Sequence, residues 1–427
     1  MDFCAEEKGE KMKNYDLAIV GGCSAGIVAA INSKRIYPEL KVAVVEKLPR
    51  AGKKILATGN GKCNITNLNA LEHNYINKEF ADFALESYPP QKIIDFFSSL
   101  GLLTYSDSCG RIYPESNTAA SVTDALRFEL ERLGVEVICD TPVTEIKKTK
   151  NGFTVNGNIF CQKIIIATGG KSSAPQGSDG SGYILAKMLG HSVTKTYPAL
   201  VPLNASPEIT KSLKGVRVRN VCLTLRGDKV LAKTQGEILF TDYGLSGIAA
   251  MELAAEAQKY IDSVKYNPFT YIDFLPDMAY NDLVEYLKNL NKIKGFCQID
   301  NLLTGILPKA AGVAICKACN LYKSDKLISE LSEKDFRLIA EKTKKFPLEV
   351  TGTRGFLNSQ VTSGGIKVSE INKKTMESLI CKNLYFAGEI IDVDGGCGGF
   401  NLQWAWASGM LAGELKQFQT EIIYDKD

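Results

Sequence analysis

A glycine-rich turn near the start of the chain constrains the fold more than any other feature. An apolar run over residues 15–20 leads into Gly21-Gly22-Cys23-Ser24-Ala25-Gly26, and a helix-like stretch follows over residues 27–35. A second apolar run then covers residues 41–46. Strand, glycine turn, helix and strand within about thirty residues make a βαβ unit, whose strands are parallel and whose crossover is right-handed. The sequence therefore predicts an α/β fold that begins with a Rossmann-like unit.

The turn carries two of the three glycines of a dinucleotide-binding fingerprint. Gly21 and Gly26 occupy the first and third glycine positions, whereas Cys23 occupies the middle one. Such glycines let the backbone approach a pyrophosphate, whose charge lies at the positive end of the following helix. Glu46 stands twenty residues beyond Gly26, where a carboxylate binds ribose hydroxyls. We therefore expect an adenine dinucleotide here; an ordinary turn followed by a surface glutamate is the alternative.

Changes of pattern along the chain indicate several domains. A chain of 427 residues is expected to form two or three domains. The middle of the chain shifts to β-like alternation and then to helical, lysine-rich segments, before a strand and a helix return near the C-terminus. We expect a Rossmann-like domain split between the two ends of the chain, with a β-rich domain and a small helical domain inserted. The expected parts are a disordered tail at 1–13, the split domain at 14–195 and 350–418, the β-rich domain at 196–274 and a helical cap at 275–349.

The near balance of charge restricts the partners. The chain has 51 Lys+Arg against 48 Asp+Glu, which gives a formal net charge of +3. This balance provides no broad electrostatic surface for nucleic acid or for an anionic membrane. The chain also lacks any run of about 18 apolar residues, and its first residues are charged. We therefore expect neither a nucleic-acid partner nor a membrane span.

Histidine and cysteine usage restricts the metal and redox chemistry. His73 and His191 are the two histidines, which excludes a multi-histidine metal centre. The 12 cysteines lack the spacing of a disulfide framework, as is typical of reduced thiols in the cytoplasm. Cys316 and Cys319 have CxxC spacing but no second Cys/His pair, so we interpret them as structural. We expect a cytoplasmic protein without a bound metal.

The segment after Glu46 carries a family resemblance. It runs from Pro49 to Asn67 and contains Gly52-Lys53-Lys54, a glycine-rich loop and Lys62-Cys63-Asn64-Ile65-Thr66-Asn67. This pattern resembles that of bacterial flavoproteins, a family that includes aminoacetone-oxidase-like proteins and the bile-acid 3-oxo-Δ4,6-reductase. The resemblance extends over most of the chain and implies FAD as the cofactor. Amides of the small residues would follow the pyrophosphate and ribityl chain, while Lys54 and Lys62 would neutralise phosphate charge.

A second specific segment lies near the C-terminus. It comprises Thr362–Ile366 and Asn383–Ala405, with a strand, a glycine-rich loop and the start of a helix. In relatives of this type the strand delivers an acidic residue to the ribityl or phosphate region, which makes Glu389 and Asp392 candidate ligands. The helix would begin at the flavin, where its positive end favours the anion formed on reduction.

The motifs and the resemblance together define the predicted cofactor site. Val143 is included because the family implies backbone contacts to the adenine side, although sequence alone favours a core position. Trp404 and Trp406 are interpreted as packing residues, since large aromatics in an Ala/Gly-rich helix usually pack. The predicted cofactor-binding residues are Gly21, Ser24, Ala25, Gly26, Glu46, Lys47, Lys54, Gly59, Asn60, Lys62, Cys63, Asn64, Val143, Ala167, Thr168, Gly169, Gly388, Glu389, Asp392, Gly399, Phe400, Asn401 and Leu402.

The resemblance implies a flavin-dependent oxidoreductase that acts on a small hydrophobic substrate. We expect hydride transfer from NADH or NADPH through flavin N5 to an electron-poor C=C, as in a 3-oxo-Δ4 or Δ4,6 steroid or bile-acid-like enone. No catalytic residue is assigned; Tyr113 and Tyr243 are candidate proton donors. A flavin oxidase that acts on a small amine with oxygen and a non-catalytic flavin redox module are the alternatives. No second nucleotide fingerprint indicates a dedicated nicotinamide-binding domain.

Overall fold

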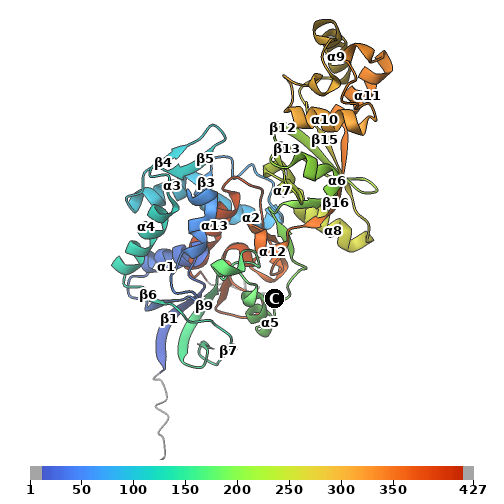
Figure 1. The fold of residues 1–427 in the computed structure, drawn as a ribbon. Helices are drawn as coiled ribbons and strands as arrows, with labels where there is room; N and C mark the ends of the chain where they lie inside the picture. The colour runs from blue at the N-terminus through green and yellow to red at the C-terminus, as the bar shows by residue number, and fades with distance from the viewer. Residues whose placement is uncertain (1–11, 417–427) are drawn as a thin grey trace, which may run out of the picture. The chain divides into compact units, whose positions relative to one another are not determined.

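The chain folds into two compact units, which the computed structural model describes for residues 12–416 (Figure 1). The first unit comprises the residues up to Thr196 and from Val361 onward, and the second comprises Tyr197–Gln360. Residues 1–11 of the expected tail lie outside the described residues. Lys13, which we also expected in that tail, instead begins the first strand and pairs with Ile159.

The first unit is built on a seven-stranded sheet of order β6-β2-β1-β9-β8-β7, with β18 pairing with β9. The pairs among β6, β2, β1, β9 and β18 are parallel, whereas β8 and β7 are added in antiparallel orientation. The strands are β1 (Lys13–Val20), β2 (Val42–Val45), β6 (Glu136–Ile138), β7 (Ile146–Lys148), β8 (Phe153–Val155), β9 (Ile159–Ile166) and β18 (Leu384–Phe386).

The predicted βαβ unit is confirmed. β1 and β2 are parallel, with Leu17 opposite Val42, and α1 (Ser24–Ile36) connects them. Leu17, Ala18 and Ile19 are fully buried. A continuous apolar run with no exposed face is expected of a central parallel strand that is covered on both sides.

The C-terminal part of the chain returns to this domain, as predicted. β18 pairs with β9, and α13 (Phe400–Gly413) packs against α1, so both ends of the chain share one hydrophobic core (Figure 1). Two glycines make the contact close: a Cβ at Gly409 would lie 2.4 Å from the Ala25 carbonyl oxygen, and one at Gly413 would lie 2.5 Å from that of Ala29. The split Rossmann-like domain is therefore confirmed.

Shorter elements complete the first unit. A small sheet has the order β3-β5-β4, and α13 contacts β3 as well as α2 and α3. These contacts link the segment after Glu46 to the C-terminal helix. The remaining elements are β3 (Thr66–Asn67), α2 (Lys78–Ser87), α3 (Pro90–Ser99), β4 (Thr104–Ser106), β5 (Arg111–Pro114), α4 (Ala119–Arg132), α5 (Ser181–Met188) and β17 (Val361–Ser363).

The second unit is a closed barrel of order β11-β14-β13-β12-β15-β16 with helices packed on it. The expected β-rich insertion and the helical part are both present, and they share one core in which Phe240 and Leu287 are fully buried. Its elements are β10 (Tyr197–Ala199), β11 (Leu203–Ala205), α6 (Pro207–Thr210), β12 (Arg217–Arg226), β13 (Val230–Phe240), β14 (Gly244–Ser246), α7 (Ile248–Glu252), α8 (Ala254–Val264), β15 (Phe269–Asp273), α9 (Tyr280–Lys294), α10 (Lys309–Ala318), α11 (Glu333–Lys344), β16 (Phe346–Thr353) and α12 (Gly355–Asn358).

The end of the second unit differs from our expectation. We expected the split domain to resume at residue 350, but Val350 lies within β16, is fully buried and pairs with Ala205 of β11. The first unit resumes at Val361. β16 closes the barrel. Its alternation of apolar and polar residues predicts a strand but does not show which sheet the strand joins.

Trp404 and Trp406 pack in the core of the first unit, as predicted. Their side chains are 1% and 0% exposed. The indole N–H of Trp404 donates to the Gly388 carbonyl oxygen at 3.2 Å, and that of Trp406 donates to the Ile65 carbonyl oxygen at 2.8 Å. Each indole thus satisfies its only polar group, and the rings of Trp404 and Trp406 pack edge-on against Phe80 and Phe97, respectively.

We expect Trp406→Ala to lower the free energy of unfolding of the first unit by about 3–5 kcal/mol, because the change removes a buried aromatic and leaves a cavity. Urea unfolding followed by circular dichroism measures the effect. Phe296→Ala is the control: this side chain is 79% exposed, and its loss should change stability by no more than about 0.5 kcal/mol. Equal effects of the two substitutions would contradict the packing role.

Candidate functional site

The turn after β1 leaves the start of α1 open to an anion. Gly21 has φ +105°, and a Cβ there would lie 2.5 Å from the Ala167 carbonyl oxygen. A Cβ at Gly26 would lie within 2 Å of the Gly21 carbonyl oxygen, so both glycines are sterically required. Cys23 is the residue that precedes α1; its side chain does not cap the helix, and the first turn contains no acidic residue. Free amides at a positive helix end are the device that binds a pyrophosphate.

Glu46 is buried, so the alternative of a surface glutamate is wrong. Its side chain is 7% exposed and accepts two backbone hydrogen bonds, one from Gly22 N to Oε2 at 2.7 Å and one from Leu48 N to Oε1 at 2.9 Å. Each carboxylate oxygen therefore keeps acceptor capacity for a further donor, such as a ribose hydroxyl. The carboxylate is oriented by the same turn that exposes the start of α1.

Lys47 is committed to a partner within the protein. Its ammonium lies 2.8 Å from Asp179 Oδ2. Burial alone would raise the pKa of Asp179, but the hydrogen bonds from Lys47 and Ser181 lower it to about 2. The Lys47 side chain therefore ties the end of β2 to the loop before α5.

The loop from Lys53 to Gly61 consists of 3₁₀ turns interrupted by a kink at residues 58–60. Gly59, Asn60 and Cys63 all adopt left-handed φ values. A Cβ at Gly59 would lie 2.7 Å from Asn64 N, so the loop closes directly onto the segment that follows. Cys63 is fully buried, and burial raises the pKa of its thiol to about 12. The Cys63 side chain is thus a neutral packing group.

Lys54 and Glu389 meet although 335 residues separate them. Lys54 Nζ donates to Glu389 Oε2 at 2.9 Å, and Glu389 Oε1 accepts from Thr362 N at 2.7 Å. We expected the Lys54 ammonium to neutralise a phosphate, but in the protein it is paired with the Glu389 carboxylate. Lys62, the other basic residue predicted for that purpose, is exposed.

The start of α13 lies against the segment after Glu46. Gly399 precedes the helix with φ +97°, and a Cβ there would lie 2.7 Å from both Asn64 Oδ1 and the Thr66 carbonyl oxygen. The first turn of α13 contains no acidic residue and no side chain caps it. Asn64 is 7% exposed, and its Oδ1 atom has no hydrogen-bond partner among residues 12–416. A buried acceptor without a partner beside an open helix end indicates a ligand position.

His73, Asn67 and Asn401, here called the loop clamp, hold the loop before α13. His73 stacks on Phe400 with ring centroids 3.7 Å apart and planes 6° from parallel, and its Nε2 accepts from Gly396 N at 2.9 Å. Asn67 Nδ2 donates to the Gly398 carbonyl oxygen at 2.9 Å. Asn401 closes the loop from the other side, because its Oδ1 accepts from the amide of the first loop glycine at 2.9 Å. A lone histidine in a loop carries no spacing signal, so no sequence pattern points to the clamp.

The strand ends bring the other predicted residues to the same edge. Ala167 follows β9 and lies under the β1 turn. The Thr168 Oγ1 atom is buried, and the described part of the chain offers it no hydrogen-bond partner. Gly388 has φ +76°, and a Cβ there would lie 2.8 Å from the Ala25 Cβ. The C-terminal segment at 383–405 therefore contacts the start of α1. Asp392 accepts a hydrogen bond from a threonine hydroxyl at 3.0 Å. Ligands bind at this carboxyl edge in open α/β sheets.

Val143 lies in the loop after β6. It is half-buried and packs against the hydrophobic core, as sequence alone favours. The same loop is tied to the end of β2, since Thr141 N donates to the Glu46 carbonyl oxygen at 2.9 Å. This bond brings the loop next to the Glu46 backbone.

We expect the first unit to lose stability as the pH falls from about 6.5 towards 4, because His73 must stay neutral to accept the Gly396 amide. Burial lowers the pKa of His73 to about 4, so over this window the unfolded chain takes up a proton that the folded chain does not. Between pH 7 and pH 5 the wild type should lose about 1–2 kcal/mol more than His73→Gln, whose amide acceptor does not titrate.

Urea unfolding of the cofactor-free chain at the two pH values measures this difference. The pKa of His191 is also lowered by burial, but His191 is present in both proteins and its contribution cancels. Equal losses in wild type and His73→Gln would show that the imidazole does not hold the loop.

Known proteins resemble this chain over most of its length. A family model described as the HI0933-like protein Rossmann domain matches residues 15–415. The 3-dehydro-bile acid delta(4,6)-reductase of Clostridium scindens is 37% identical over 403 residues, with 93% of this chain and 98% of that protein covered. The ribosomal RNA dihydrouridine synthase of Escherichia coli is 29% identical over 405 residues, with 93% and 96% covered.

One solved structure supports the fold. The 3-ketosteroid delta1-dehydrogenase of Sterolibacterium denitrificans has a TM-score of 0.51 at 14% identity, covering 94% of this chain and 99% of that one. This likeness concerns the backbone arrangement. Within residues 12–416, no helix combines the length and apolar character that crossing a membrane requires.

Proposed function

The chain belongs to the HI0933-like Rossmann-domain family, and from this premise we propose that it is an FAD-dependent reductase of electron-poor C=C bonds that takes electrons from NADH or NADPH. The relative from Clostridium scindens, which matches almost end to end, is named for a 3-dehydro bile acid and its delta(4,6) unsaturation. A steroid-like or bile-acid-like enone is therefore the substrate class that we assign. The observation that carries the proposal is that one domain holds two uncapped helix starts, those of α1 and α13, together with the buried Glu46 carboxylate.

Each of these features fits one part of FAD. Amides of Ser24, Ala25 and Gly26 would bind the pyrophosphate, and Glu46 would accept from the adenine ribose hydroxyls. Lys62 would approach the phosphates from the exposed loop, whereas the Lys54–Glu389 pair would border the ribityl region. The remaining predicted cofactor residues lie on loops and strand ends of the first unit, except Phe400, Asn401 and Leu402, which begin α13.

The start of α13 would stabilise negative charge on the flavin pyrimidine. Its uncapped amides, held in place by His73 and Asn67, would stabilise negative charge there by typically 0.3–1 kcal/mol and up to about 2 when partly buried. When bound, flavin supplies a hydride acceptor and donor, which lets electrons from the nicotinamide reach the β-carbon of an enone. The protein itself would bind and orient the cofactor, exclude water and hold a proton.

Tyr113 is a candidate for holding that proton. It lies in β5, and a Cβ at Gly59 would be 3.5 Å from its ring, so the phenol borders the cofactor loop. Burial raises the pKa of Tyr113, and the neighbouring Arg111 guanidinium opposes only part of the rise. The phenol therefore stays protonated near neutral pH and has a proton to give. Tyr243, the other candidate, belongs to the second unit, where the Arg354 guanidinium lies 4.7 Å from its ring centre.

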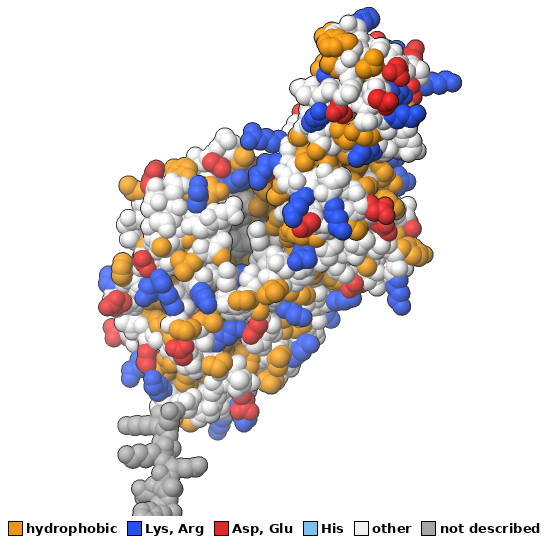
Figure 2. All heavy atoms as spheres, viewed as in Figure 1, with side chains coloured by type: hydrophobic (Ala, Val, Ile, Leu, Met, Phe, Trp, Pro, Cys, Tyr) orange, Lys and Arg blue, Asp and Glu red, His pale blue; other side chains and the backbone are white. Residues whose placement is uncertain are grey.

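A flavin oxidase of small amines remains the main alternative, and a non-catalytic flavin redox module is the second. The relative from Escherichia coli, named for ribosomal RNA, adds RNA as another substrate class to test. On the face that Figure 2 shows, lysine and arginine side chains are interspersed with acidic ones, and the formal net charge is +3. Nucleic-acid binding usually depends on a concentrated basic surface, so we favour the small hydrophobic substrate.

We expect Glu46→Ala to weaken FAD binding by roughly ten- to a hundred-fold, because hydrogen bonds to a charged group contribute about 1.5–3 kcal/mol. Titration of the cofactor-free chain with FAD, followed by quenching of flavin fluorescence, gives the affinity. Glu136→Ala is the matched control, since this glutamate lies on the neighbouring strand β6, about half exposed and paired with Lys13. An unchanged affinity in Glu46→Ala would remove the ribose assignment.

The reaction itself is tested in two anaerobic half-reactions. We expect NADH or NADPH to bleach the bound flavin, and a 3-oxo-Δ4 steroid to restore its absorbance. Hydrogen peroxide release that matches amine consumption would support the oxidase instead, and reoxidation by uridine-containing ribosomal RNA would move the substrate to nucleic acid. A flavin that neither nicotinamide reduces would overturn the reductase proposal.

A further inference from the structure

A bulge in β12 forms one edge of a cavity within the second unit. Val218 pairs with Ile238 and Val221 pairs with Gly236, so three steps along β12 oppose two along β13. Asn220 adopts a left-handed φ of +50° within this bulge. Bulges redirect side chains and are concentrated beside functional sites.

Side-chain hydrogen bonds on both sides hold the bulge. Asn220 Nδ2 donates to Asp277 Oδ2 at 2.6 Å, and Gln235 Nε2 donates to Asn220 Oδ1 at 2.8 Å. These bonds stabilise a backbone conformation that non-glycine residues rarely adopt. The bulge is therefore a fixed feature of the barrel edge, and it determines where the preceding side chain, Arg219, lies.

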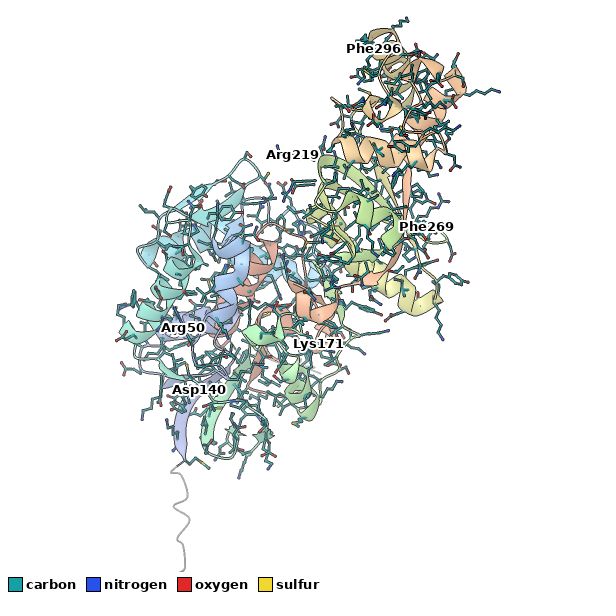
Figure 3. All side chains as sticks on the ribbon, in the orientation of Figure 1. Arg50, Asp140, Lys171, Arg219, Phe269 and Phe296 are labelled. Carbon is teal, nitrogen blue, oxygen red and sulfur yellow. The ribbon has the colours of Figure 1, made fainter. Side chains whose placement is uncertain are left out.

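Arg219 is the cation that the bulge leaves available. It is exposed on β12 (Figure 3), and no hydrogen bond or ion pair of its guanidinium is found within residues 12–416. Arg217, two residues earlier, is neutralised by Glu237 at 2.6 Å. Asp277 also borders the cavity, but its carboxylate accepts the hydrogen bond that anchors the bulge. A planar guanidinium without a partner is suited to a carboxylate, which it binds through two parallel hydrogen bonds.

The cavity beside Arg219 has the size and walls of a small-molecule site. Its volume is about 660 Å³, within the roughly 300–1,000 Å³ that ligand pockets occupy. Leu275, Met278 and Ile306 are among the apolar residues that line it. The single aromatic ring in the lining, Phe274, is only 2% exposed and presents no face on which a nucleotide base could stack.

We propose that this cavity is a second binding site, which takes an amphipathic carboxylate: an apolar body between the β12 bulge and the loops before α9 and α10, and a carboxylate on Arg219. The site lies entirely within the second unit, so the inference does not depend on FAD binding in the first. The carboxylate can belong to a rigid ring system or to a flexible alkyl chain. Free phosphate lacks the apolar body and is not expected to bind.

Calorimetric titration of the full-length chain tests the site. The probes are cholate, its uncharged methyl ester, dodecanoate and inorganic phosphate, each used below the concentration at which micelles form. We expect a carboxylate probe to bind and Arg219→Ala to weaken its binding about five-fold, with no change for the ester. Tighter binding of cholate assigns a ring acid, tighter binding of dodecanoate assigns a fatty acid, and both results support the proposal.

Two further variants test whether the carboxylate binds in this cavity. Arg226→Ala removes another exposed arginine from the same strand, outside the cavity lining, and should leave the affinity unchanged. Met278→Trp should fill the cavity and weaken acid and ester alike, while circular dichroism verifies that each variant folds. The proposal is overturned if neither carboxylate binds at millimolar concentration, if Arg219→Ala binds as the wild type does, or if phosphate displaces the bound acid.

Discussion

The close packing of α13 on α1 is the contact on which the candidate site depends. Gly409 and Gly413 lie one turn apart on α13 and let its backbone rest on the carbonyl oxygens of Ala25 and Ala29. A side chain at either glycine would push the helices apart, and with them the two helix starts that face the proposed cofactor. The chain is split by an insertion of more than a hundred residues, yet this contact makes its two ends one domain.

The local geometry follows from that contact. Once α13 is fixed, its start lies beside Asn64 and Thr66. The Lys54–Glu389 ion pair joins the segment after Glu46 to the segment before α13. Two buried polar atoms there, Asn64 Oδ1 and Thr168 Oγ1, have no hydrogen-bond partner in the part of the chain that the structure describes. In a domain this well packed, such atoms are explained most simply by a ligand that supplies their hydrogen bonds.

The sequence predicted the features that depend on local pattern. The βαβ unit, the required glycines at 21 and 26, the position of Glu46 and the return of the C-terminal strand all follow from spacing and apolar periodicity, and the structure has them. Features that depend on distant contacts could not be predicted. The stacking of His73 on Phe400 and the capture of Lys54 by Glu389 join residues more than 300 positions apart, and no pattern near either residue specifies its partner. The expected resumption of the split domain at residue 350 differs from the structure for the same reason, because the sheet that the strand Phe346–Thr353 joins is a tertiary property.

Hydrogen–deuterium exchange of the full-length chain with and without FAD tests the central claim most directly, namely that both ends of the chain form one cofactor site. The account predicts that FAD protects the amides at 21–26 and at 399–402 together, with the same dependence on FAD concentration, and leaves the barrel strands of the second unit unchanged. Protection of the first segment alone, or protection of the two segments at different FAD concentrations, would contradict a single site built from both ends.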